Sequence, residues 1–257
     1  MKYLIGNWKM QLTEKESEQL AGEIHRLIGS WLAGSDVAVV LCPAHMALAA
    51  VSRTVADSPL ALGAQDVFWE DKGAYTGEIS PVTLKELGCG YCLVGHSERR
   101  QYLGESDEMV NRKVAAILRH DLTPVICVGE TMEERQAGRR EAVVINQVKA
   151  ALANNRPVGN HKIIVAYEPR WVIGSGQAVS PTDAAEMHHL IRDALHQVYG
   201  EEVAERHCAV IYGGAVDAKN LRGFLDVPVI DGVLVGGASL KPNEFRAMAA
   251  IAAGQES

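Results

Sequence analysis

Glu168 is a carboxylate at the end of a predicted strand, and the residues that follow it could cover it. Residues 162–165 are mostly apolar and β-branched, as is typical of a strand buried on both faces. Pro169 and Trp171 come directly after the glutamate, and the backbone from Gly174 onward is free to approach a ligand or to move. The pattern predicts a general base beneath a lid. A helix cap above an ordinary glycine turn is the alternative for a single glutamate in this position.

Polar residues and paired glycines follow four other predicted strands. They are Asn7 and Lys9 after the first strand, His96 after the fourth, and the pairs 213–214 and 236–237 after the seventh and eighth. Each of these has a simpler explanation when taken alone: Lys9 fits a solvated surface charge, His96 a buried imidazole with hydrogen-bond partners, and the glycine pairs tight turns. A carboxylate, an imidazole and an ammonium on one rim could together remove a proton beside a carbonyl and stabilise the resulting enediolate. Backbone N–H groups at the glycine pairs could bind phosphate, which predicts aldose–ketose isomerisation of a small phosphorylated sugar.

Strand and helix signals alternate eight times along the chain, without hairpin signals. The expected strands are 3–8, 36–42, 60–64, 91–95, 123–128, 162–165, 208–212 and 232–235. The expected helices are 13–32, 43–56, 80–87, 106–119 and 131–153, with three more beginning near 180, 217 and 242. This α/β pattern predicts one closed (β/α)8 barrel domain over residues 1–257, in which the carboxyl ends of the strands meet at one mouth. An open dinucleotide-binding sheet would require G-x-G-x-x-G after the first strand, where Gly6-Asn7-Trp8-Lys9 stands.

The bulk composition sets limits on partners and compartment. Of 257 residues, 47% are hydrophobic and 22% charged, and the net charge is −7. This balance argues against nucleic acid and anionic membranes as partners but leaves room for a local cationic pocket. The N-terminus does not resemble a signal peptide and no apolar run is long enough to span a membrane, so we expect a cytoplasmic protein.

Five cysteines are scattered through mostly apolar surroundings, which suits buried thiols in a reducing compartment. Cys89 and Cys92 have the C-x-x-C spacing of a redox or zinc site. They begin a strand instead of a helix, however, and no second pair of ligands has matching spacing. We therefore expect neither a metal nor a cofactor.

Over essentially its whole length the chain resembles triosephosphate isomerase. The motifs that carry the resemblance occur in the family's order, and they are Gly6-Asn7-Trp8-Lys9-Met10, Val94-Gly95-His96-Ser97-Glu98-Arg99-Arg100, Ala166-Tyr167-Glu168-Pro169, Ile173-Gly174-Ser175-Gly176, Tyr212-Gly213-Gly214 and residues 232–240. The resemblance implies Glu168 as base, His96 as neutral electrophile, and Lys9 and Asn7 as oxyanion partners. It further implies Glu98 as an acidic neighbour of the lysine and histidine.

The resemblance also implies a phosphate site, a lid and a homodimer. The phosphate would meet backbone N–H groups at four positions, which are Gly174, Ala215, Gly236 and Gly237. The lid would span 169–179, with Tyr212 hydrogen-bonded near its C-terminal end. A loop around Thr76 would insert beside Lys9 of a second copy, near Gln65. Arg192 and Asp231 resemble an ion pair of the family, and Cys127 resembles its buried cysteine.

Four positions depart from the family's usual pattern. Residues 11–12 are Gln-Leu where the family usually has Asn-Gly, on the loop that would receive the partner. Arg170 replaces a small apolar residue in the lid hinge, and Asp66 stands where asparagine is frequent. Ala215 replaces serine, which removes a hydroxyl but leaves the backbone donor, so we expect weaker phosphate binding with the chemistry intact.

Three other functions are alternatives to the triosephosphate isomerase activity that the resemblance implies. One is an isomerase of a four-carbon sugar phosphate, which a substrate panel would separate. A second is a catalytically silent protein that binds phosphorylated ligands, although such a binder would not need Lys9, His96 and Glu168 together. The third is a redox or zinc role for Cys89 and Cys92.

Overall fold

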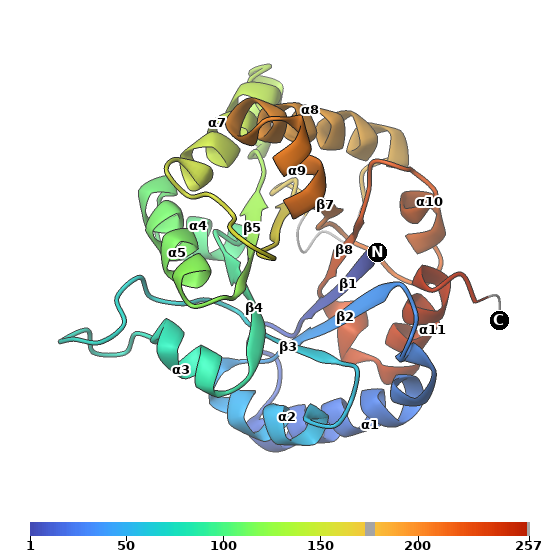
Figure 1. Cartoon of the computed structure of the whole chain (residues 1–257). Helices are drawn as coiled ribbons and strands as arrows, with labels where there is room; N and C mark the ends of the chain where they lie inside the picture. The colour runs from blue at the N-terminus through green and yellow to red at the C-terminus, as the bar shows by residue number, and fades with distance from the viewer. Residues whose placement is uncertain (173–177, 256–257) are drawn as a thin grey trace.

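Eight parallel strands close into a barrel in the computed structural model, which describes residues 1–172 and 178–255 (Figure 1). The strands are β1 (Lys2–Asn7), β2 (Val37–Cys42), β3 (Ala61–Ala64), β4 (Cys89–Val94), β5 (Thr123–Val128), β6 (Ile163–Tyr167), β7 (Cys208–Tyr212) and β8 (Gly232–Val235). Each strand pairs with the next in sequence, and β8 pairs with β1 to close the ring. The predicted (β/α)8 barrel is therefore confirmed.

Helices surround the barrel (Figure 1). They are α1 (Glu14–Leu32), η1 (His45–Ala47), α2 (Leu48–Val55), α3 (Pro81–Glu86), α4 (Ser97–Tyr102), α5 (Asp107–Arg119), α6 (Met132–Gln136), α7 (Arg140–Leu152), α8 (Pro181–Tyr199), α9 (Glu201–His207), α10 (Leu221–Leu225), η2 (Gly237–Leu240) and α11 (Pro242–Ala252). Several start where a side chain caps free N–H groups, as predicted for Thr13, Ser106 and Ser180. None of the described helices is both long and apolar enough to cross a membrane.

Two predicted helices are wrong in part. The helix expected at 43–56 does not begin at Pro43, because a short 3₁₀ turn, η1, precedes α2. The helix expected at 131–153 is two helices, α6 and α7, separated at Gly138, which has a φ of +68°. The sequence signals also missed the short helices α4 and α9.

Alternate residues of the strands form two separate layers of the core. Tyr3 and Ile5 belong to a cluster built only from strand residues inside the barrel, whereas Leu4 between them packs outward with the helices. This is the period of two expected for strands covered on both faces. The barrel is thus a filled core, and its polar residues lie where the strands end.

Candidate active site

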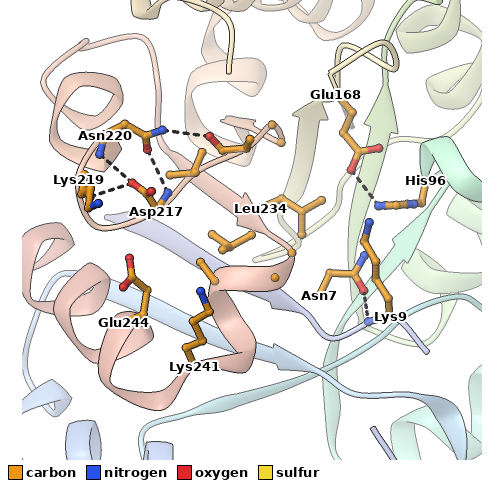
Figure 2. Close-up of a pocket in the computed structure, with 18 residues that line it drawn as sticks. Asn7, Lys9, His96, Glu168, Asp217, Lys219, Asn220, Leu234, Lys241 and Glu244 are labelled. Atoms are coloured by element: carbon orange, nitrogen blue, oxygen red, sulfur yellow. Dashed lines mark hydrogen bonds and ion pairs between the residues drawn. The ribbon is translucent and has the colours of Figure 1, made fainter. Parts of the chain in front are cut away.

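A cavity of about 550 Å³ opens at the carboxyl ends of the strands. Among the residues that line it are the predicted Asn7, Lys9, His96, Glu168, Ala215, Gly236 and Gly237, together with Lys219, Lys241 and Glu244. Figure 2 shows Asn7, Lys9, His96 and Glu168 on one side of it and the Asp217, Lys219, Lys241 and Glu244 side chains on the other. The structure therefore brings the candidate reactive groups and the candidate phosphate cradle into one site.

Glu168 follows β6 directly and is only 2% exposed. Its Oε1 lies 3.3 Å from His96 Nε2, and its Oε2 accepts a hydrogen bond of 3.1 Å from the backbone N–H of Ser97. Burial, followed by the charge of Glu168, raises the pKa of the Cys127 thiol well above its usual value, so this thiol stays protonated beside the carboxylate. Glu168 is therefore a largely desolvated carboxylate in contact with an imidazole.

His96 caps the first turn of α4 with its side chain. Its Nδ1 accepts the backbone N–H of Glu98 at 3.3 Å. A nitrogen that accepts this bond carries no proton, so the proton of the neutral ring is on Nε2, the nitrogen that faces Glu168. The ring can thus act as a neutral donor at the cavity, as the family resemblance implies.

Lys9 follows β1 in a left-handed conformation, with a φ of +51°. Two bonds hold this conformation: the Lys9 N–H donates to Asn7 Oδ1 at 3.0 Å, and its carbonyl accepts Gln65 Nε2 at 2.8 Å. Its Nζ lies 2.5 Å from Glu98 Oε1. Backbone strain of this kind persists where surrounding contacts enforce it, and here they fix the approach of an ammonium to the cavity.

The other end of the cavity is built from the segments after β7 and β8. Asn220 Nδ2 donates to the Ala215 carbonyl at 3.1 Å, which braces the first of these segments. In the second, η2 starts at Gly237, and the first N–H groups of a helical turn have no partner within it. These donors, together with the exposed Lys219 and Lys241, suit an anion such as phosphate. Gly174, the fourth predicted phosphate contact, lies outside the described residues.

Comparison with known proteins identifies the family. The profile of the triosephosphate isomerase family matches residues 2–252. The triosephosphate isomerase of Roseiflexus sp. strain RS-1 is 48% identical over 242 residues, 94% of each chain, and that of Dictyoglomus turgidum is 43% identical over 244 residues, 95% of this chain and 96% of the relative. The crystal structure of triosephosphate isomerase from Bartonella henselae has a TM-score of 0.86 at 34% identity, covering 97% of this chain and 98% of that one.

The chain belongs to the triosephosphate isomerase family. It is therefore an aldose–ketose isomerase, and its substrate is a phosphorylated sugar. The silent-binder hypothesis is wrong, and an isomerase of a four-carbon sugar is not favoured.

The described ends of segment 169–179, which the resemblance predicts to be a lid, both form hydrogen bonds with the rest of the barrel domain. At the first end, Trp171 Nε1 donates to Glu130 Oε1 at 3.0 Å, and the Arg170 N–H donates to the Glu130 carbonyl at 3.0 Å. At the second end, the Val179 N–H donates to Tyr212 Oη at 3.2 Å, which confirms the contact predicted for this tyrosine. Residues 173–177 between them lie outside the described residues. Sequence reasoning missed Glu130, although an acidic residue two positions after β5 was a visible signal.

A buried ionic cluster behind His96 was also missed. It consists of Asp66, Arg99, Glu105 and Lys113, and Lys113 is only 1% exposed. Lys113 occupies a position of α5 whose neighbours at the helical period, Val110 and Ile117, are buried. A lysine within an apolar helical stripe was the signal that could have predicted a buried partner.

The cysteine pair does not favour redox or zinc chemistry in this isomerase. Cys89 and Cys92 are both buried and free, and burial raises the pKa of the Cys89 thiol to about 12. Thiolates are the reactive and metal-binding form, and burial disfavours them here. Within the described part of the chain, no group of three or more His, Cys, Asp or Glu side chains could hold a metal ion.

Proposed function

We propose that Glu168 is the base that interconverts D-glyceraldehyde 3-phosphate and dihydroxyacetone phosphate through an enediolate. The observation that carries this assignment is the pair formed by the desolvated Glu168 carboxylate and the Nε2–H of His96, 3.3 Å apart at the cavity. A carboxylate in this setting removes a proton from the carbon beside the carbonyl, and the protonated acid returns it to the adjacent carbon. One residue thus makes both proton transfers at carbon, while the hydroxyl proton of the enediolate passes to the former carbonyl oxygen and completes the isomerisation.

His96 and Lys9 act on the oxygens of the substrate. The carbonyl oxygen gains negative charge as the proton leaves carbon, and Nε2–H of His96 and Nζ of Lys9, which both line the cavity, can donate hydrogen bonds to it. Asn7 supports Lys9 through its bond to the Lys9 N–H, and Glu98 pairs with the ammonium. In the described structure Glu168 also accepts the Ser97 N–H, so the carboxylate must turn from that donor to reach substrate.

The phosphate end of the substrate binds to backbone N–H groups of Ala215, Gly236 and Gly237, with Gly174 of the lid as the fourth contact. Ala215, Gly236 and Gly237 line the cavity that holds the base, and Gly174 lies outside the described residues. The alanine provides only its N–H at a position where a serine would add a hydroxyl. We expect this enzyme to bind phosphate less tightly than a serine-containing relative, without loss of the chemical step.

Replacing Glu168 by aspartate tests the assignment. The Glu168→Asp carboxylate is about one methylene shorter, and a misplacement of about 1 Å costs up to about a hundredfold in rate. We expect kcat for the two triose phosphates to fall by about a hundredfold with KM little changed. Glu141→Asp, at an exposed position of α7, is the matched control and should retain full activity.

Two results would contradict the proposal. One is a Glu168→Asp enzyme as fast as the wild type. The other is a wild type that isomerises a four-carbon sugar phosphate faster than the triose phosphates in a parallel assay.

We further propose that residues 1–257 form one catalytic domain that works as a homodimer in the cytoplasm, in glycolysis and gluconeogenesis. Support for the dimer comes from the segment between β3 and α3, which contains Thr76 and projects away from the barrel (Figure 1). Met10, Met46 and Tyr102 are 93%, 86% and 72% exposed, so these apolar side chains are available for contact with a second copy. Sedimentation at micromolar concentration should give twice the mass of the chain, and a monomer at that concentration would refute the dimer.

A further inference from the structure

Glu105 is a buried carboxylate that contacts the backbone just before His96, from outside the cavity. The residue is 4% exposed. Its Oε2 accepts the backbone N–H of Gly95 at 3.0 Å, and its Oε1 accepts a short hydrogen bond from Lys113 Nζ. The two carboxylate oxygens therefore accept from two different donors. One donor is the N–H of Gly95, directly after β4, and the other is Lys113 on α5.

The next peptide group, which carries the Gly95 carbonyl, is held as well. The Gly95 carbonyl accepts Arg100 Nε at 2.8 Å, and Arg100 is fixed by an ion pair of 2.6 Å with Asp107. The His96 carbonyl then accepts the N–H groups of Arg99 and Arg100, which starts α4. With the backbone fixed on both sides, and with Nδ1 held by the Glu98 N–H, few torsions remain that could move His96 Nε2.

The charges around Glu105 balance. Lys113 Nζ lies 2.7 Å from Asp66 Oδ1, Arg99 Nη2 lies 2.8 Å from Asp66 Oδ2, and Arg99 Nε lies 3.5 Å from Glu105 Oε2. Two cations thus face two carboxylates in a buried cluster. Asp66 shares these cations with Glu105, but within the described residues its carboxylate makes no hydrogen bond to the backbone of residues 95–97.

We propose that Glu105 is a positioning residue for catalysis, because it fixes the backbone from which His96 presents Nε2 to the substrate. The proposal rests on the proposed role of His96. Donors that stabilise a developing oxyanion must be held close to their productive positions, and about 1 Å of displacement costs up to about a hundredfold in rate. A group that holds the backbone but never touches substrate should then affect kcat and leave phosphate binding alone.

Glu105→Gln and Asp66→Asn form a matched pair of variants. Each removes one negative charge from the same cluster. Glutamine has one acceptor oxygen, so it cannot serve both the Gly95 N–H and Lys113 Nζ as the carboxylate does. Asp66→Asn changes the charge to the same extent but leaves the Gly95 contact in place, and it introduces the residue that is frequent in the family.

The measurements are steady-state kinetics on the full-length enzyme, with the folded fraction checked at the assay temperature, and ¹⁵N spectra of the histidine rings. For Glu105→Gln we expect kcat to fall by about tenfold to a hundredfold with KM within about twofold, and the His96 ring signals to shift. For Asp66→Asn we expect kcat within about threefold of wild type and unchanged His96 signals. If Glu105→Gln folds poorly, the double variant Glu105→Gln/Lys113→Gln removes one charge of each sign and should show the same loss in kcat.

Equal losses of kcat in the two single variants, or a Glu105→Gln enzyme with wild-type kcat, would overturn the proposal. His96→Gln in the same assay separates this failure from failure of the proposed function. If His96→Gln loses activity by orders of magnitude while Glu105→Gln does not, His96 keeps its role and only the positioning role is lost. If His96→Gln is fully active, the assignment of His96 itself is wrong.

Discussion

Glu168 is confined by backbone as well as by its polar partners. A methyl group on Gly213 would lie 2.7 Å from Glu168 Cγ, which is closer than side-chain carbons approach in real proteins. The residue at 213 must therefore be glycine for the carboxylate to keep its place. This glycine lets the segment that follows β7 pass close to the base that follows β6.

Gly213→Ala should impair catalysis more than folding. The added methyl has to push the Glu168 side chain aside, and a shift of about 1 Å is worth up to about a hundredfold in rate. We expect kcat to fall by about tenfold or more, with the melting temperature lowered by a few degrees at most. Gly223→Ala in α10 is the control, since its methyl meets Pro181 at an ordinary 3.5 Å. A Gly213→Ala enzyme with wild-type kcat would show that the Glu168 side chain accommodates the added methyl without leaving its catalytic position.

The reactive residues could be found from the sequence because they interrupt apolar strands at their carboxyl ends. Glu168, His96 and Lys9 each have that signal, and the barrel topology brings such ends together. Glu105 and Lys113 could not be placed this way. Their partners are set by how α5 packs on β4, and this packing depends on the whole core and not on local pattern.

At the scale of elements, strands were predicted more accurately than helices. The bounds expected for 123–128 and 208–212 are those of β5 and β7. Buried parallel strands are short apolar runs with polar or glycine neighbours, so the sequence marks both of their ends. Helix starts with a capping residue, such as Ser180 before α8, were equally clear.

The break between α6 and α7 lies at a glycine inside the predicted helix. Residues 131–153 are otherwise rich in helix-forming residues, and the chain turns at Gly138. The turn lets α6 contact the start of the lid, where the Arg135 guanidinium lies 4.8 Å from the centre of the Trp171 ring. The left-handed glycine thus ends α6 and allows this tertiary contact near the site.

At the scale of the whole molecule, His188 links stability to pH. It lies on α8 against the barrel and is fully buried, with Nδ1 2.7 Å from the Ala184 carbonyl and its ring edge against Tyr167. Burial lowers the pKa of its imidazole from 6.5 to about 4, with a smaller contribution in the same direction from Arg192. The folded protein therefore contains a neutral histidine at pH values where an unfolded chain would protonate it.

The sign of the resulting pH dependence follows from proton uptake. Between pH 6.5 and about 4 the unfolded state binds the proton and the folded state does not, so the free energy of unfolding falls as the pH falls through this window. Above pH 6.5 this histidine contributes no slope. Two to three pKa units correspond to about 3 kcal/mol of stability lost across the window.

His188→Gln should therefore flatten the acid side of the stability profile, although the substitution lowers stability near pH 7 by disturbing a packed site. Urea unfolding at intervals from pH 4 to pH 7.5 measures both effects. His189→Gln is the control, because His189 is the next residue on the same helix and is exposed. Asp66 and Asp231, whose pKa values burial raises, contribute the opposite slope at acid pH in wild type and variants alike, so the difference between profiles isolates His188. If His188→Gln and wild type lose stability in parallel below pH 6.5, the acid sensitivity comes from other groups and the buried imidazole is protonated without cost to the fold.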